Sequence, residues 1–361
     1  MLISEFDYHL PLELIAQQPL IPRDASRMMV LEREKGTLRD QAFQDLPQIL
    51  EPGDLLVFNN TKVFPARLLG RRRGLRAQPL GKRNPAAREF LKGEVELLLT
   101  RQEEGDVWEG LVHPGRKVRT GEVLLFGEGE LEAEVIGRGD YGVRRVRLRA
   151  REGAVEDAID RLGRVPLPPY IRRADEAPDR ETYQTIYAKV RGAVAAPTAG
   201  FHFTEKVLVA LRRREIATCE ITLHVGLGTF QPVRVEQVEN HKMEAERFEI
   251  PEPAAIALSE ALEQGRRIIA VGTTSLRTLE HVGQVHGGRI EPGRGETNLF
   301  IYPGFKFRVI RGLLTNFHLP RSTLLMLVCA WAGRGLTLRA YQHAAQGRYR
   351  FYSYGDCMLV V

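Results

Sequence analysis

Between residues 93 and 149, hydrophobic and polar positions alternate in short runs that glycines and acidic residues separate. Alternation with a period of two is typical of half-buried β-strands, and regularly spaced short strands are typical of a small antiparallel barrel or sandwich. In the last run, Arg144 shares one face with Val146 and Leu148, opposite to the arginines at 145, 147 and 149. The strands predicted here span residues 94–99, 108–112, 123–126, 131–136 and 143–149.

Beyond residue 150 the pattern changes to alternating strands and helices. Thr204 is a candidate helix N-cap, because an apolar stretch with helical spacing follows it. Ser322 or Thr323 caps an apolar helix that begins at Leu324 and ends at Gly333. The other predicted elements are strands over 217–223 and 267–271 and helices over 205–214, 253–264 and 274–282. Strand, helix and strand at this spacing indicate βαβ units and a parallel or mixed sheet.

These two patterns predict an α/β protein, a mixed-sheet α/β domain that carries an inserted antiparallel β-barrel. A chain of 361 residues is long enough for about two domains. We expect residues 1–65 and 151–361 to form one discontinuous α/β domain, and residues 66–150 to form the barrel.

The composition excludes several classes of protein. With 43% hydrophobic and 27% charged residues, the chain matches soluble globular proteins, not disordered, collagen-like or coiled-coil ones. Its longest apolar run, residues 324–332, is less than half of the roughly 20 residues that span a bilayer, and the N-terminus lacks the basic region of a signal peptide. We therefore expect a cytoplasmic protein without a membrane partner. Cys219, Cys329 and Cys357 lack the spacing of a zinc site or a disulfide framework.

The charge of the chain points towards polyanions. Lys and Arg number 52 against 46 Asp and Glu, which gives a formal net charge of +6. Arginine far outnumbers lysine, and its guanidinium presents a rigid fork to phosphates. Between Arg67 and Lys92 the only acid is Glu89, and prolines and glycines predict a loop. Taken alone, such a run is read most simply as a solvated linker.

One candidate anion site lies at the start of a predicted helix. Strand 268–271 runs into a Gly-Thr-Thr-Ser sequence that begins at Gly272. Free backbone amides and hydroxyls at the positive end of a helix can bind a carboxylate or a phosphate. Arg277, about one turn further on, can add a bidentate contact. An ordinary Ser/Thr helix cap explains the same residues equally well.

Residues 194–203 surround His202 with small residues, proline, glycine and aromatics. Small residues let the backbone approach a flat ligand closely, and Phe201 or Phe203 can stack on a base. A core histidine with satisfied hydrogen bonds is an equal alternative.

Two further segments suggest phosphate or metal chemistry only weakly. Gly226 and Gly228 follow strand 217–223 as in a phosphate-type turn, but the GxGxxG pattern is incomplete. His241 and Glu246 lie five residues apart without an HExxH motif, so we expect no metal site.

Near the C-terminus, two segments place polar side chains where an α/β sheet carries its chemistry. Asn316-Phe317-His318 ends a predicted strand ahead of a helix. Asp356 lies at a glycine turn among aromatic residues, for which a solvated acid is the alternative. No nucleophile elbow, P-loop or zinc spacing is present, which disfavours hydrolases, kinases and metalloenzymes.

Long strings in a fixed order make the chain similar to a known family. They are Asp7-Tyr8, Leu14-Ile15-Ala16-Gln17, residues 52–61, Tyr183-Gln184-Thr185, residues 195–200, residues 222–226, residues 271–275, residues 315–320 and Tyr354-Gly355-Asp356. Over nearly its whole length the chain resembles the S-adenosylmethionine:tRNA ribosyltransferase-isomerases of queuosine biosynthesis.

The resemblance implies a reaction. The ribosyl part of S-adenosylmethionine is transferred to 7-aminomethyl-7-deazaguanine at the tRNA wobble position and isomerised, which gives epoxyqueuosine and releases adenine and methionine. It also implies an α/β domain with a β-barrel insertion and no metal. S-adenosylmethionine is consumed as a substrate, so no other cofactor is expected.

This chemistry needs a base for the ribose carbon beside the sulfonium, a proton for the departing adenine and a cationic or helix-terminus site for the methionine carboxylate. We expect His202 or His224 as the base, with His318 and Asp356 as alternative acid–base partners. At the methionine carboxylate or a tRNA phosphate we expect Thr273, Thr274 and Arg277. The remaining candidates for substrate binding are Thr198, Gly200, Gly226, Glu246 and Asn316.

The chain departs from the family pattern in two segments and at one position. The usual His-Met-His-Ser-Glu is replaced by residues 241–246, which leaves Glu246 as the safer candidate, and Arg311 stands where an acid is usual. Residues 74–92 resemble an insertion, and with a tRNA substrate we expect this basic stretch and its flank to contact phosphates. The expected tRNA-binding residues are Arg71, Arg72, Arg73, Lys82 and Arg83.

Two rival functions remain at this stage. A non-catalytic RNA-binding protein would bind tRNA with a strong salt dependence and release no adenine. An S-adenosylmethionine methyltransferase would produce S-adenosylhomocysteine, and the incomplete glycine loop disfavours it. We expect a monomer.

Overall fold

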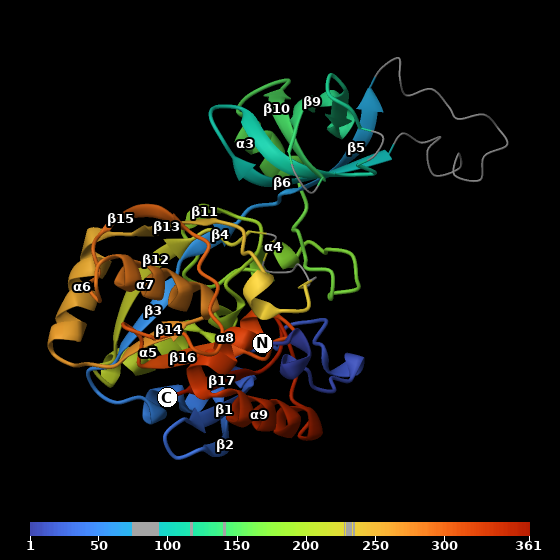
Figure 1. Ribbon diagram of the computed structural model, residues 1–361. Helices are drawn as coiled ribbons and strands as arrows, with labels where there is room; N and C mark the ends of the chain where they lie inside the picture. Colours follow the sequence, from blue (N-terminus) through green and yellow to red (C-terminus); the bar gives the residue numbers. More distant parts are fainter. Residues whose placement is uncertain (74–93, 116–117, 140–141, 227, 229–232, 234) are drawn as a thin grey trace.

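The two predicted regimes form separate sheets in the computed structural model, which describes residues 1–73, 94–115, 118–139, 142–226, 228, 233 and 235–361. Within these residues, nine strands form a mixed sheet and six form a closed barrel. The barrel stands at one end of the molecule, above the large sheet (Figure 1). The predicted α/β fold with an antiparallel barrel is therefore confirmed.

The large sheet has a parallel centre and antiparallel edges. Strands β12, β3, β14 and β16 run parallel, whereas β16 and β17 are antiparallel. In spatial order the strands are β15 (Gly293–Thr297), β13 (Glu246–Ile250), β12 (Ala217–Leu223), β3 (Leu55–Asn59), β14 (Ile268–Val271), β16 (Gly312–Asn316), β17 (Cys357–Val360), β1 (Arg27–Glu32) and β2 (Thr37–Ala42).

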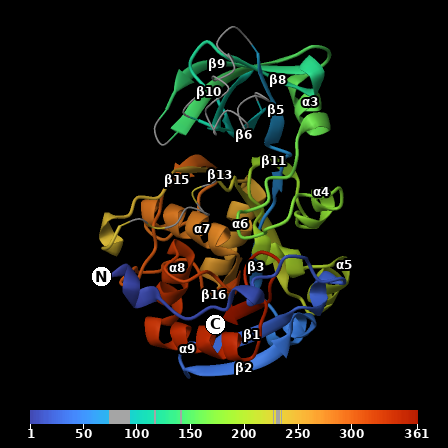
Figure 2. The same cartoon turned by 90° about the vertical axis from the view of Figure 1, so that its right-hand side faces the viewer.

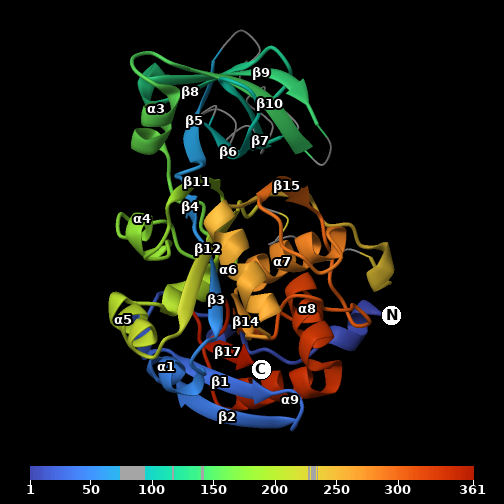
Figure 3. The ribbon, with the colours of Figure 1, turned by 90° about the vertical axis from the view of Figure 1, so that its left-hand side faces the viewer.

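Helices cover both faces of this sheet, because its central strands are apolar on both sides. Leu55 and Val57 of β3 belong to one core, and Leu56 and Phe58 belong to the other. The first core lies under α6 (Glu252–Glu263), α7 (Thr273–Val285), α8 (Thr323–Ala332) and α9 (Arg334–Gln346). The second lies under α1 (Leu46–Ile49) and α5 (Glu205–Arg213), on the opposite face (Figure 3).

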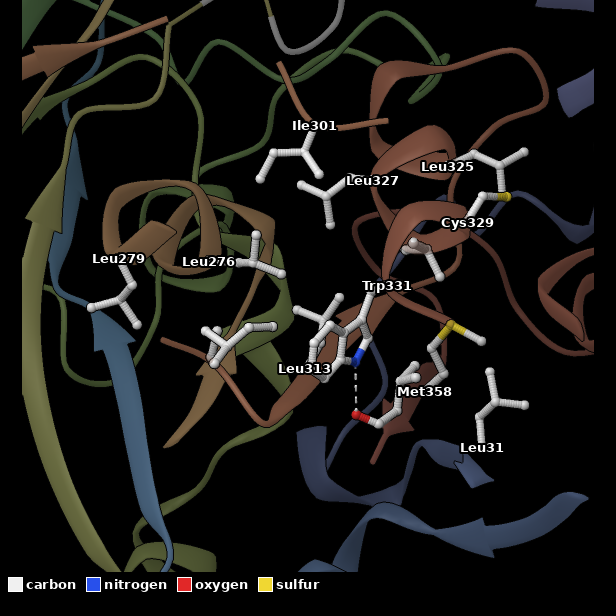
Figure 4. Close-up of a cluster of buried hydrophobic side chains, with 14 of the residues drawn as sticks. Leu31, Leu276, Leu279, Ile301, Leu313, Leu325, Leu327, Cys329, Trp331 and Met358 are labelled. Atoms are coloured by element: carbon white, nitrogen blue, oxygen red, sulfur yellow. Dashed lines mark hydrogen bonds between the residues drawn. The ribbon is translucent and has the colours of Figure 1, made fainter. Parts of the chain in front are cut away.

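The first core fixes the helices that follow the parallel strands. Figure 4 shows Trp331 of α8 between Leu313 of β16 and Met358 of β17. The indole Nε1 donates a hydrogen bond of 3.3 Å to the carbonyl oxygen of Val360. Leu276 of α7 packs in the same cluster, so the first turn of α7 is anchored to the core at the end of β14.

The predicted helix ends agree with the structure. Thr204 Oγ1 accepts a hydrogen bond of 3.4 Å from the amide of Val207, and Ser322 Oγ accepts one of 3.2 Å from the amide of Leu325. Helix α7 is longer than predicted and begins directly after Gly272, whose φ is +89°. In the described part of the chain, no helix is both long and apolar enough to cross a membrane.

The barrel alternates apolar interior with charged exterior positions. Val146 and Leu148 of β10 are buried in its core, whereas Arg147 lies outside, opposite Glu134 of β9. Its strands are β10 (Val143–Ala150), β7 (Val107–His113), β6 (Glu94–Gln102), β5 (Arg67–Arg73), β8 (Val123–Phe126) and β9 (Leu131–Arg138), and α3 (Val155–Leu162) packs on the same core.

The prediction of a loop from residue 67 onwards is wrong for its first seven residues. Arg67–Arg73 form β5, paired with β6 and β8. Because arginines are so frequent in this segment, its short alternation of buried and exposed positions is hard to recognise from the sequence. Leu68 is buried in the barrel core. The rest of that stretch lies outside the described residues.

Two strands cross between the barrel and the large sheet. On the way out, β4 (Thr61–Val63) follows the carboxyl end of β3, and on the way back β11 (Val190–Ala193) pairs with it in parallel. A short helix, α4 (Asp179–Thr182), lies on the return path beside them (Figure 2). The crossing therefore places the barrel over the carboxyl ends of the parallel strands (Figure 1).

Candidate active site

The carboxyl ends of the parallel strands bring the predicted functional segments together. His224 follows β12, Thr61 follows β3, Thr273 follows β14 and His318 follows β16. Ligands of open α/β sheets bind at this edge, because the strand ends leave loops and helix N-termini that converge there. Residues more than 100 positions apart in the sequence thus share one site.

One cavity of about 560 Å³, partly open to solvent, lies directly on this edge, and we call it the inner cavity. It contains the amino end of α7, where unbonded backbone amides favour an anion. Its lining residues are Tyr170, Ala196, Pro197, Thr198, Ala199, Val225, Gly272, Thr273, Thr274, Thr315, Asn316, Phe317, His318, Leu324, Tyr352 and Ser353.

Two further open cavities, of about 1080 and 1380 Å³, lie between the barrel and the large sheet. Both are lined by Arg101 of β6 and by Gly192, His224 and Arg247, and we call them together the domain cleft. Val225 lines both the inner cavity and the domain cleft, so the two spaces adjoin.

His224 faces the domain cleft. Its Nδ1 lies 2.8 Å from Oγ1 of Thr61. Burial lowers the pKa of His224 to about 4, with a smaller lowering by Arg247 and a raising by Glu249. The imidazole is therefore neutral near pH 7, which is the form that accepts a proton.

His202 is bonded at both ring nitrogens. Nδ1 lies 2.7 Å from Ser26 Oγ, and Nε2 lies 3.2 Å from Oδ1 of Asn316. Asn316 donates through its amide to the carbonyl oxygen of Tyr352, so its oxygen points at the imidazole. Burial lowers the pKa of His202 to about 4. This geometry is that of the core histidine weighed as the alternative for this segment.

His318 lines the inner cavity. Its Nε2 lies 2.8 Å from Oγ1 of Thr315, and its backbone amide donates to the hydroxyl of Tyr341. Burial lowers the pKa of His318 to about 3, so it too is neutral near pH 7.

The carboxylate of Asp356 is taken up by hydrogen bonds and an ion pair to other segments of the chain. Its carboxylate accepts the backbone amides of Arg27 at 2.9 Å and Arg350 at 2.8 Å, and pairs with the guanidinium of Arg27 at 3.3 Å. These bonds join the starts of β1 and β17, and they give Asp356 a bracing function. Its predicted acid–base role stays a prediction.

Glu246 and Arg277 form a buried ion pair at the floor of the domain cleft. The other oxygen of Glu246 accepts the amide of Gly226 at 3.0 Å, so the pair supports the loop after His224. Nε and Nη1 of Arg277 are buried and find no hydrogen-bond partner among the residues that the structure describes.

The threonines and small residues divide between cavity and core. Thr198, Thr273 and Thr274 line the inner cavity, as a substrate-binding role requires. A Cβ at Gly200 would lie 1.9 Å from the hydroxyl of Tyr187, so packing within the protein explains that glycine. Phe203 is buried in the second core, which removes it as a base-stacking residue.

The predicted tRNA-binding arginines lie on β5, on the barrel. Arg71 and Arg73 are exposed, and Arg73 pairs with Glu132 at 2.8 Å. Arg72 is half-buried and pairs with Glu122. Lys82 and Arg83 lie outside the described residues.

Several residues of the site were not singled out from the sequence. Thr61 and Gly192 contact the imidazole of His224, Arg101 lines the domain cleft together with His224, and Tyr170 forms part of the inner cavity. No local pattern marks them, because each is brought to the site by strand pairing or by the barrel. Among the described residues, no group of three or more His, Cys, Asp or Glu side chains could hold a metal ion.

Comparison with known proteins places the chain in a family. The family model described as "Queuosine biosynthesis protein" matches residues 3–360. Proteins named S-adenosylmethionine:tRNA ribosyltransferase-isomerase from Solibacter usitatus and Moorella thermoacetica are 53% and 50% identical, and each alignment covers all of both chains. A solved structure of S-adenosylmethionine tRNA ribosyltransferase from Thermotoga maritima is 37% identical, with a TM-score of 0.55 over 99% of this chain and 100% of that one. The chain belongs to the queuosine biosynthesis protein family.

Proposed function

We propose that this protein transfers the ribosyl part of S-adenosylmethionine to 7-aminomethyl-7-deazaguanine at the wobble position of a tRNA and isomerises it to epoxyqueuosine, releasing adenine and methionine. The observation that carries the proposal is the full-length match, at 50% identity or more, to relatives named S-adenosylmethionine:tRNA ribosyltransferase-isomerase. The cavities at the carboxyl edge of the sheet support it, because they offer adjoining spaces for a small molecule and a larger partner.

In this proposal the methionine part of S-adenosylmethionine occupies the inner cavity. Its carboxylate takes the amino end of α7, where Thr273 and Thr274 supply hydroxyls beside free amides. Thr198 and Asn316 border the same space. Arg277 supports this region through Glu246, and a direct contact between Arg277 and substrate stays a prediction.

His224 is the base in this scheme. It takes a proton from the ribose carbon beside the sulfonium, so that a C–H bond breaks, an N–H bond forms and the electron pair stays on carbon next to the positive sulfur. His224 is preferred over His202, because both ring nitrogens of His202 are bonded in the core. Departing adenine takes up the proton that His224 has removed, and His318, neutral in the inner cavity, is the candidate acid–base partner that receives this proton and passes it on.

The tRNA enters through the domain cleft. Arg101 and Arg247 line this space, and Arg71 is exposed on the barrel. Cations placed there attract the phosphates that flank the wobble base. S-adenosylmethionine is a consumed substrate in this scheme and no cofactor takes part, so turnover in the presence of a chelator should equal turnover without it.

The test is to incubate the protein with S-adenosylmethionine and tRNA carrying the deazaguanine precursor, then to analyse small molecules and digested nucleosides. Adenine and methionine in equal amounts, with epoxyqueuosine in the tRNA, are expected. S-adenosylhomocysteine would identify a methyltransferase instead, and tRNA binding without products would identify a binding protein.

His224→Ala sharpens the same assay. Loss of a positioned general base costs about 10²- to 10⁴-fold in rate, so adenine release should fall by that factor while the protein stays folded. Adenine release near the wild-type rate in folded H224A would remove His224 from the mechanism.

A further inference from the structure

His224 is held between the two strands that cross from the large sheet to the barrel. Thr61 opens β4, and Gly192 lies in β11, which pairs with β4 in parallel. Both residues touch the imidazole, although they are 163 and 32 positions away from it in the sequence. The crossing strands thus form a cradle for this one side chain.

Gly192 lets the backbone of β11 approach the imidazole more closely than any side chain would allow. A Cβ built there would lie 2.6 Å from Cε1 of His224, 2.8 Å from Nδ1 and 2.9 Å from Nε2. The φ angle of Gly192 is +153°, which L side chains rarely adopt. One side of the ring consequently lies directly against the strand.

Thr61 is the hydrogen-bond partner of the ring at Nδ1. Its buried hydroxyl lies 2.8 Å from Nδ1 and makes a long contact of 3.5 Å with the carbonyl oxygen of Val190. A carbonyl oxygen accepts only, so a hydroxyl that donates to Val190 must accept from His224. That arrangement satisfies both groups, and it puts the proton on Nδ1.

The other nitrogen is then the free one. Nε2 of His224 makes no hydrogen bond to any residue that the structure describes, and the ring lines both cavities of the domain cleft. An imidazole with its proton on Nδ1 presents the lone pair of Nε2, which is the atom that a general base uses.

We propose that Thr61 and Gly192 are positioning residues, which fix the tautomer and the orientation of His224 so that an unprotonated Nε2 faces the domain cleft. The catalytic part of this inference rests on the proposed function, since it takes His224 as the base. The tautomer itself does not, and it can be measured on the protein alone.

The tautomer is read from the ¹⁵N chemical shifts of histidine ring nitrogens in labelled full-length protein, with H224Q to assign the signals. Protonated Nδ1 and bare Nε2 are expected for His224, and T61V should lose this preference. A proton on Nε2 in the wild type would overturn the inference. A protein that shows the expected tautomer and releases no adenine would refute the proposed function and leave the positioning intact.

Thr61→Val and Thr61→Ser test the consequence for rate. T61V keeps the shape and removes the hydroxyl, so kcat for adenine release should fall about 10- to 100-fold, as for other partners that orient a functional histidine, with KM for S-adenosylmethionine unchanged. T61S should restore most of the rate. T337V is the matched control, because Thr337 is equally buried on α9 and its hydroxyl donates to Gly333 far from the cleft. Equal kcat for T61V and wild type would contradict the proposal.

Gly192→Ala tests the cradle from its other side. G192A should reduce kcat at least as much as T61V, because its Cβ displaces the imidazole. G293A is the control for backbone strain alone, since Gly293 has a φ of +154° with no atom within 4 Å of its Cβ position. An equal effect of G192A and G293A on kcat would show that contact with the ring is unimportant.

Discussion

Two histidines at the same edge of the sheet differ in what their second ring nitrogen does. His202 and His224 both have Nδ1 next to a hydroxyl, at 2.7 Å from Ser26 and 2.8 Å from Thr61. Burial lowers both pKa values to about 4. However, Nε2 of His202 is bonded to Asn316, whereas Nε2 of His224 faces the domain cleft. A lowered pKa therefore does not by itself separate a reactive imidazole from a structural one.

The difference follows from where each residue leaves its element. His202 closes a short 3-10 turn, Thr198–His202, whose neighbours pack into the second core beside Phe43. His224 lies directly after β12, under the barrel. Packing around His202 supplies partners for both ring nitrogens, whereas one side of the His224 ring stays open to the domain cleft.

The largest effect expected from this comparison is on acid stability. The pKa of His202 falls from 6.5 to about 4 on folding. Above pH 6.5 this imidazole is neutral in both the folded and the unfolded chain, so it does not make the free energy of unfolding depend on pH. Between pH 6.5 and pH 4 the unfolded chain binds a proton that the folded one refuses, so the free energy of unfolding drops by about 1.4 kcal/mol per pH unit.

Urea unfolding of wild type, H202Q and H224Q across this pH range measures the loss. H202Q should show a shallower pH dependence than wild type, by one proton. H224Q should make the slope shallower by a similar amount, because folding lowers the pKa of His224 to about 4 as well. Equal slopes for H202Q and wild type would mean that His202 is not buried as a neutral group.

A smaller effect is expected when the hydroxyl partners are removed one at a time. S26A leaves a buried imidazole nitrogen unpaired, so it should lower the free energy of unfolding by about 1–3 kcal/mol and change kcat little. T61V should cause the larger loss in kcat, because the hydroxyl of Thr61 is the partner of the proposed base. The measurements are unfolding curves and adenine release for both variants. A drop in kcat for folded S26A as deep as that for T61V would contradict the distinction between a structural His202 and a reactive His224.

Local patterns were sufficient for most of the fold. Alternation over 131–136 and 143–149 and the capped helix after Thr204 reappear in the structure, since each depends on residues close in sequence. The strand Arg67–Arg73 was missed, because its pairing partners in β6 and β8 stabilise a segment whose composition resembles a loop.

Local sequence patterns predicted only part of the candidate site. The loops after β12, β14 and β16 could be proposed, because chemistry gathers at strand ends in α/β sheets. That His202 is bonded twice and His224 once depends on Ser26, Asn316 and Thr61, which lie more than 100 positions away in the chain. Such contacts arise from sheet order and from the barrel crossing, and no local window contains them.

The smallest expected effect concerns the ion pair that spans the domain cleft beside His224. Arg101 of β6 and Glu296 of β15 lie 2.9 Å apart, and both side chains are about 43% exposed or more. Exposed pairs of this kind contribute about 0–1 kcal/mol and weaken with salt. E296Q should therefore change the free energy of unfolding by less than about 1 kcal/mol, and any difference from wild type should vanish at high ionic strength. Adenine release by E296Q should stay close to wild type, because strands β4 and β11 already hold His224 in place. A loss in E296Q as deep as that in T61V would mean that the barrel, not the strand crossing, keeps the imidazole in position.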